Sequence, residues 1–207
     1  MSFDMEMEDY IEDMEFKNKA NDLVILTTAV NRPEVHSKSL PPVVEMLYKH
    51  GLKVKWVVNI DKVVDDVTVE ETISNFETIF DKGIIDCTFL SENEPCFFNA
   101  VKRLVFKVDD DNILDKIKYG VLWLEDDWNI KNLNILNDAL KKYTDNCYIQ
   151  LTDRDWESNN QEVSFNPCLW GKNIFKKVMI DLFKQHDHSK FLLYREEGKG
   201  NPERFVT

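Results

Sequence analysis

The sequence predicts an α/β fold with one central, mostly parallel mixed sheet flanked by helices on both faces. Short apolar runs typical of strands alternate with longer segments whose apolar residues recur at helical spacing. The run at residues 121–124 is apolar throughout, as expected of a central strand that is covered on both faces. The later runs are shorter and irregularly connected, which favours a mixed sheet over an all-parallel one.

Length and charge bound the domain organisation and the partners. At 207 residues the chain suits a single Rossmann-like domain, expected over residues 22–207 and preceded by an acidic arm or helix at residues 1–21. Residues 1–15 carry seven acids and no lysine or arginine, unlike a signal peptide. The net charge of −12 argues against a nucleic-acid-binding face and against adhesion to anionic lipid. No apolar run approaches the ~18 residues of a transmembrane helix, so we expect no membrane insertion.

The cysteines indicate a reducing compartment. They are widely spaced, form no CxxC pair and are expected to be buried thiols rather than zinc ligands or disulfides. The four are Cys87, Cys96, Cys147 and Cys168. A cytoplasmic location is therefore predicted.

The first half of the domain, about residues 22–128, is expected to alternate strands and helices. Ser39 is predicted to cap a helix with Pro41 and Pro42 in its first turn, where missing N–H donors are tolerated. Thr68 and Glu71 have the spacing of a capping box before a second helix. Strands are predicted at 23–28, 54–60, 84–90 and 121–124, a third helix at 97–108 and a short helical stretch at 113–118.

The second half, about residues 129–207, is predicted to be less regular. Helices are expected at 130–143 and 174–183, and strands at 148–152 and 191–194, with no element assigned over 163–171. The polar tail at 195–207 ends without an obvious final element, which is compatible with further domains in a longer chain.

Three consecutive carboxylates, Glu125 to Asp127, follow the strand at 121–124. The carboxyl end of a strand in an open α/β sheet is the usual place for a ligand. If strand geometry persists, Glu125 and Asp127 point one way and Asp126 the other. Converging carboxylates there could hold Mg²⁺ or Mn²⁺. The alternative is an acidic turn or a helix start capped by Asp127 or Asn129.

Other polar clusters receive a structural interpretation. Asp109 to Asp111 follow an amphipathic helix and are expected to form a solvated helix end. His186 and His188 could reach a metal ion, but a helix C-terminus is the ordinary place for them. Trp156 and Trp170 could stack on a sugar, yet such residues more often fill the core.

Four motifs, in this order, resemble the nucleotide-sugar glycosyltransferases of the GT-A type. They are Thr27–Pro33, Trp56–Asp61, Phe98–Val101 and Gly120–Asp127, the last at the place of the family's aspartate-rich "DxD" region. Over residues 23–129 the order and spacing are similar to those of the animal β-1,3-glucuronyltransferases. The small size and the Lys- and Asn-rich loops look like the capsid-decorating glycosyltransferases of large DNA viruses of algae, the chlorella viruses.

The resemblance implies a transfer from a UDP-sugar donor to an acceptor hydroxyl on a glycan or glycoprotein, with Mn²⁺ (or Mg²⁺) as cofactor. A viral enzyme of this kind would act in the host cytoplasm. The implied nucleotide contacts are Thr28, Arg32, Asp61 (to the uracil ring) and Asn99, with Arg32 or Lys38 supplying positive charge. Asp127 would bind the metal ion, and Glu125 or Asp126 would lie near the ribose or a metal-bound water; we take Glu125 as the second metal ligand and Asp126 as the substrate contact. The three acids begin one position earlier than in the family, and Trp128 stands in the place of the last one.

An inverting transfer also needs a carboxylate base near the acceptor hydroxyl. Asp153, Asp155 and Glu157 follow a predicted strand end, and Asp155 is preferred over Asp153. A solvated acidic loop is the alternative for these residues, Asp187 and Glu203 are outside candidates, and a retaining transfer needs no such base.

Two other functions compete with the transferase. A catalytically silent nucleotide-binding or interaction module could keep the same fold. An α/β phosphohydrolase would need an acidic nucleophile at the end of the first strand, where threonine and alanine stand.

Overall fold

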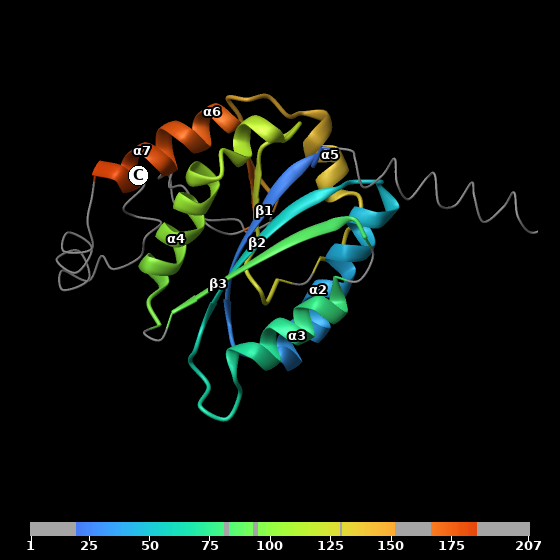
Figure 1. Ribbon diagram of the computed structural model, residues 1–207. Coiled ribbons are helices and arrows are strands. Elements are labelled where there is room, and N and C mark those ends of the chain that lie inside the picture. The colour runs from blue at the N-terminus through green and yellow to red at the C-terminus, as the bar shows by residue number, and fades with distance from the viewer. Residues whose placement is uncertain (1–19, 81–82, 93–94, 129, 152–166, 186–207) are drawn as a thin grey trace, which may run out of the picture.

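The computed structural model describes residues 20–80, 83–92, 95–128, 130–151 and 167–185. Within these ranges six strands form one sheet in the order β3-β2-β1-β4-β6-β5 (Figure 1). The strands are β1 (Leu23–Val30), β2 (Val54–Asp61), β3 (Ile85–Glu92), β4 (Val121–Trp123), β5 (Tyr148–Gln150) and β6 (Cys168–Trp170). Strands β1 to β4 pair in parallel, and β6 runs antiparallel to both β4 and β5. The prediction of a mostly parallel, mixed α/β sheet is confirmed.

Helices cover both faces of the sheet, as predicted (Figure 1). On one face lie α2 (Pro33–Lys49), α3 (Val69–Ile79) and α5 (Ile135–Lys141). On the other lie α4 (Phe97–Asp110), a 3₁₀ turn at Ile113–Lys116, and a continuous helical segment made of α6 (Lys172–Ile174), a π-helical stretch (Phe175–Ile180) and α7 (Asp181–Gln185). No helix in the described ranges is long and apolar enough to span a bilayer.

The side chains of β1 show why this strand is central. Leu23 and Ile25 are fully buried under α2 and α3, whereas Val24 and Leu26 are fully buried under α4. Successive residues of a strand point to opposite faces, so a strand that is apolar at every position must be covered on both sides.

The chain reverses its direction across the sheet between β1 and β4. The path from β1 through α2, β2 and α3 to β3 builds one half of the sheet outward. After β3, α4 crosses the opposite face and β4 pairs with the free side of β1. The carboxyl ends of β1 and β4 therefore flank a topological switch point, where open α/β sheets bind their ligands.

The predicted start of the first helix is wrong. Helix α2 begins at Pro33, six residues before Ser39, so Pro41 and Pro42 lie inside it. Pro33 occupies the first turn, where its missing donor costs nothing. The two internal prolines remove N–H donors that would bond within the helix. The fully buried face of α2, which includes Leu40, offsets this loss.

Several other boundaries differ from the prediction. Strand β6 was not predicted, α5 is a seven-residue helix, and β4 ends at Trp123. The capping box of α3 is confirmed, because Thr68 and Glu71 each bond the other's backbone N–H. The predicted strand at 191–194, and nearly all of the arm at 1–21, lie outside the described residues.

The acidic cluster at Asp109 to Asp111 is a helix end, as expected. Asp111 caps α4 and pairs with Lys107 one turn earlier, at 3.1 Å. Asp109 pairs with Lys184 of α7. These contacts give the cluster a structural explanation.

Candidate functional site

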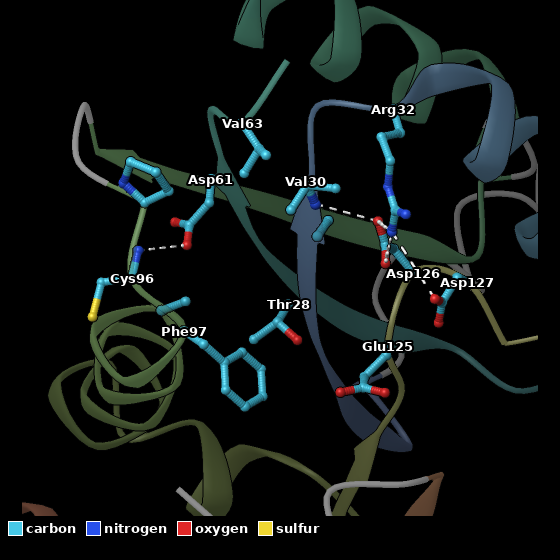
Figure 2. Close-up of a pocket in the computed structure, with 13 residues that line it drawn as sticks. Thr28, Val30, Arg32, Asp61, Val63, Cys96, Phe97, Glu125, Asp126 and Asp127 are labelled. Atoms are coloured by element: carbon cyan, nitrogen blue, oxygen red, sulfur yellow. Dashed lines mark hydrogen bonds and ion pairs between the residues drawn. The ribbon is translucent and has the colours of Figure 1, made fainter. Parts of the chain in front are cut away.

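A cavity of about 370 Å³ opens at the switch point, within the usual size range of small-molecule sites (Figure 2). Four segments line it: the end of β1, the end of β2 with the following residue 63, the start of α4, and the turn after β4. The lining residues are Thr28, Ala29, Val30, Arg32, Asp61, Val63, Pro95, Cys96, Phe97, Ala100, Glu125, Asp126 and Asp127.

Asp126 is held by hydrogen bonds to the protein itself. It is 4% exposed, and its Oδ2 accepts from the Val30 backbone N–H at 3.2 Å and lies 2.9 Å from Nε2 of His36. Its Oδ1 accepts from Nη2 of Arg32 at 3.3 Å. The Ser39 hydroxyl donates to the Asp126 backbone carbonyl. The carboxylate therefore ties the turn after β4 to the end of β1 and to the first turns of α2.

The neighbouring carboxylates lie differently. Asp127 has a side chain that is 55% exposed, and its Oδ2 lies 4.0 Å from Nη2 of Arg32. Glu125 is half-buried, and its Oε2 accepts from Nε1 of Trp128 at 2.9 Å. Figure 2 shows both at the edge of the cavity, with Arg32 on the same side as Asp127. All three carboxylates line the cavity, and the buried one lies between the two that are more exposed.

The turn has this geometry because β4 continues for one bond beyond its last strand residue. The Leu124 N–H donates to the Leu26 carbonyl at 2.9 Å, so the chain still follows β1 as it enters the acidic turn, which comprises residues 124–128. Val30 then donates to the Asp126 side chain instead of to a strand carbonyl. The carboxylate satisfies a donor that the short strand leaves unpaired.

Asp61 is also fixed by the protein. Its Oδ1 accepts from Asn59 Nδ2 and from Arg103 Nη2, both at 2.9 Å, and its Oδ2 accepts from the Cys96 backbone N–H at 3.0 Å. A carboxylate has about four lone-pair sites, so these three donors leave capacity for one from a ligand.

The opposite wall of the cavity carries apolar side chains beside Asp61. Val63 and Phe97 flank Asp61 and are among the exposed large apolar side chains of the described residues (Figure 2). The fully buried Asn31 holds the loop that carries Val63: its Oδ1 accepts from the N–H groups of Val63 and Val64 at 2.7 and 2.8 Å. Its Nδ2 donates to the carbonyls of Val64 and Val67, each at 2.6 Å.

The structure gathers most of the predicted site residues in one place. Thr28, Arg32, Asp61, Glu125, Asp126 and Asp127 all line the cavity. Asn99 of α4 is half-buried and Lys38 of α2 is exposed; neither is in the cavity lining. The remaining candidates lie outside the described residues: Asp153, Asp155, Trp156, Glu157, His186, Asp187, His188 and Glu203.

Trp170 belongs to the core. It is fully buried in β6, and its Nε1 donates to the Cys168 sulfur at 3.0 Å. A side chain in this position cannot stack on a sugar at the surface.

Three residues that support the site were not predicted. His36 and Ser39 bond Asp126, and Arg103 bonds Asp61. The sequence does carry one signal for the first two, because Arg32, His36 and Ser39 follow one another at helical spacing once the helix begins at Pro33. No comparable signal marks Arg103, since its partners come from other elements.

The charge of the cavity fits a divalent cation shared with an anionic ligand. One guanidinium lines it, against four carboxylates. In the described part of the chain no three His, Cys, Asp or Glu side chains form a complete metal cage. Mg²⁺ at nucleotide sites is commonly bound by one or two carboxylates together with phosphates and waters. Asp127 and Glu125 fit that role, whereas the oxygens of Asp126 are engaged by His36, Arg32 and Val30.

Comparison with known proteins finds no matching protein-family model and no significant match among curated proteins.

Proposed function

We propose that the protein is a metal-dependent glycosyltransferase that moves a sugar from a UDP-sugar to an acceptor hydroxyl. One observation carries the proposal: at the switch point of the sheet, Arg32 and the carboxylates of residues 125–127 meet at one cavity. A diphosphate is anionic and this cavity is mainly acidic, so a divalent cation between them makes the two compatible.

Each carboxylate of the acidic turn would have a different role. Asp127 would be the main metal ligand and Glu125 the second, while Arg32 would also face the phosphates as a charge-assisted donor. When bound, the cation would neutralise the charge that builds on the leaving diphosphate and orient the donor. Asp126 would hold the turn through its protein partners and contact substrate at most through its remaining acceptor capacity.

The other half of the cavity would take the nucleoside. Asp61 retains acceptor capacity for an N–H group such as the one on uracil, and Thr28 lies on the neighbouring strand end. Val63 and Phe97 supply apolar surface for a flat ring.

The proposed acceptor and catalytic base are inferred from the resemblance, and the candidate bases lie outside the described ranges. For an inverting transfer, Asp155, or else Asp153, would take the proton of the acceptor hydroxyl as its oxygen attacks the anomeric carbon and the bond to the diphosphate breaks. A glycan or glycoprotein acceptor, including a viral capsid protein in the host cytoplasm, completes the proposal.

Thermal unfolding of the full chain with nucleotides tests the proposal. At about 100 times the Kd, a ligand adds ~2.7 kcal/mol of stability, which raises the Tm of a chain of this size by roughly 5 to 10 °C. We expect this shift with UDP and Mn²⁺, and not with CMP, GDP or UDP plus chelator. Absence of any nucleotide-dependent shift would overturn the proposal.

Product release separates the transferase from its nearest competitor. A catalytically silent nucleotide-binding module is the second candidate, because the protein-bonded Asp61 and Asp126 would serve a binding site equally well. The transferase should release UDP from at least one UDP-sugar in an Mn²⁺-dependent way, and the silent module should bind UDP without releasing it from any. A phosphohydrolase is disfavoured because the last four residues of β1, Thr27 to Val30, include no acidic nucleophile.

A further inference from the structure

We infer that His36 is a positioning residue, which holds the acidic turn (residues 124–128) in the arrangement that the metal ligands need. This inference rests on the proposed function and adds to it a residue of α2 that does not line the cavity. His36 would act through Asp126, one residue away from each proposed ligand.

The surroundings of His36 show how its imidazole contacts Asp126. The side chain is fully buried, Nε2 lies 2.9 Å from Asp126 Oδ2, and the ring packs on Phe76 with the centroids 4.5 Å apart. A carboxylate only accepts hydrogen bonds, so Nε2 must carry the proton and donate. Within the described residues Nδ1 has no hydrogen-bond partner.

Helix α2 and the residue before it contact both the side chain and the backbone of Asp126. His36 bonds its side chain, and Ser39, three residues further along the helix, bonds its backbone carbonyl. Arg32, one turn before His36, bonds the other carboxylate oxygen. Contacts to both the side chain and the main chain of one residue fix its orientation as well as its position.

The orientation of Asp126 decides where its neighbours emerge. Glu125 and Asp127 flank it in the chain, so a rotation of the Asp126 backbone would swing both carboxylates away from the cavity. Outer partners of this kind in metal sites typically change metal affinity or activity by about 10- to 100-fold when they are removed. We expect an effect of that size at His36.

Paired variants of the full chain test the inference. His36→Gln keeps an amide N–H donor near the place of Nε2, and His36→Leu removes the donor at similar volume. His50→Leu is the matched control, because His50 follows the end of α2 and its Nε2 lies 2.9 Å from the Leu133 carbonyl, away from the cavity.

The affinity for UDP in Mn²⁺, measured by calorimetry, is the first readout. His36→Leu should weaken it by about 10- to 100-fold, while His36→Gln should restore most of the loss and His50→Leu should leave the affinity unchanged. A merely structural role predicts another result: His36→Leu lowers the Tm, yet the folded protein binds Mn²⁺–UDP as tightly as wild type. That result would overturn the inference.

The second readout needs no ligand. Trp128 donates to Glu125 Oε2 at 2.9 Å, so the ¹⁹F resonance of 5-fluorotryptophan at position 128, assigned with Trp128→Phe, reports on the turn. His36→Leu should shift or broaden this resonance and His36→Gln should not. If wild type binds no Mn²⁺–UDP, the proposed function fails, and an unchanged Trp128 resonance in His36→Leu would separately reject the positioning role.

Ser39→Ala provides the test if His36→Leu does not fold. It removes only the Ser39 hydroxyl, which bonds the Asp126 carbonyl and also the Val35 carbonyl one turn earlier in α2. The Trp128 resonance should move and the affinity for Mn²⁺–UDP should fall several-fold. If Ser39→Ala matched wild type in both readouts, the result would contradict the proposal that α2 holds the acidic turn in place.

Discussion

The Arg103 guanidinium of α4 lies against the Asp61 carboxylate at the end of β2, with Nη2 2.9 Å from Oδ1. The same group donates through Nε to Asn59 Oδ1 at 2.7 Å and pairs through Nη1 with Glu92 of β3 at 2.7 Å. Arg103 supports Asp61 from one face of the sheet much as His36 supports Asp126 from the other. Both buried carboxylates at the cavity are therefore oriented by a helix.

Replacing Arg103 tests whether this support matters for the nucleotide. Arg103→Met removes the charged donor to an Asp61 that is almost fully buried, and we expect a loss of about 2 to 3 kcal/mol in the free energy of unfolding. It should also weaken UDP binding and narrow the preference for UDP over CMP. Urea unfolding and calorimetry measure the two effects. Arg103→Lys should recover part of each, because an ammonium keeps the charge but not the fork of donors. Unaltered nucleotide preference in Arg103→Met would exclude a role of Asp61 in reading the base.

Replacement by asparagine should lower mainly the stability of the protein at Asp126 and mainly the metal-dependent binding of UDP at Asp127. Asp126→Asn places an amide where Val30, His36 and Arg32 all donate, so we expect a loss of roughly 2 to 4 kcal/mol in stability. Asp127→Asn, on a largely exposed side chain, should leave the Tm within a degree or two and abolish the Mn²⁺-dependent part of UDP binding. Differential scanning fluorimetry with and without Mn²⁺–UDP measures both. Equal loss of stability in the two variants would contradict this division of roles.

The local sequence carries enough information for the core of the fold and for one edge of the site. The apolar runs of β1 and β4 and the Thr68–Glu71 pair are signals that tertiary contacts do not override. The alternation of side chains predicted for a continuing strand does not apply to the three carboxylates, because β4 ends at Trp123 and all three line the cavity; Asp126 is the buried one. The strand that precedes residues 125–127 distinguished these acids from the acids at residues 109–111, which follow a helix.

The missed features depend on contacts between distant segments. Two proline signals compete at the start of α2, and Ser39 is used for the carbonyl of Asp126 rather than as a cap. Strand β6 has only three residues, too few for a periodic pattern, and it exists because it pairs with β4 and β5. Asn59 lies two residues before Asp61 on β2, but Arg103 comes from α4 and no spacing in the sequence relates it to Asp61.

Gly120 is expected to be required for the pairing of β4 with β6. A Cβ at Gly120 would lie 1.8 Å from the backbone oxygen of Trp170, which cannot move without breaking the strand pair. Gly120→Ala should therefore destabilise the protein by about 3 kcal/mol or more. Gly51→Ala is the control. Gly51 has a positive φ of 59° but open space around its Cβ position, so the substitution should lower the free energy of unfolding by only about 1 kcal/mol. Chemical unfolding measures the stability of both variants. A similar loss of stability in both would mean that the backbone around Gly120 shifts easily to make room for a Cβ.

Cysteine alkylation can report on occupancy of the cavity, because Cys96 lines it whereas Cys87 of β3 does not. Burial raises the pKa of the Cys87 thiol to about 12, so at pH 8 only about one molecule in ten thousand carries the reactive thiolate at that position. Half-buried Cys96 should react with iodoacetamide at pH 8 much faster than Cys87, and peptide mass spectrometry distinguishes the two sites. Saturating UDP with Mn²⁺ should slow alkylation of Cys96 several-fold, while UDP with chelator should not. Protection that is the same with and without metal would show that the nucleotide enters this cavity independently of the acidic turn.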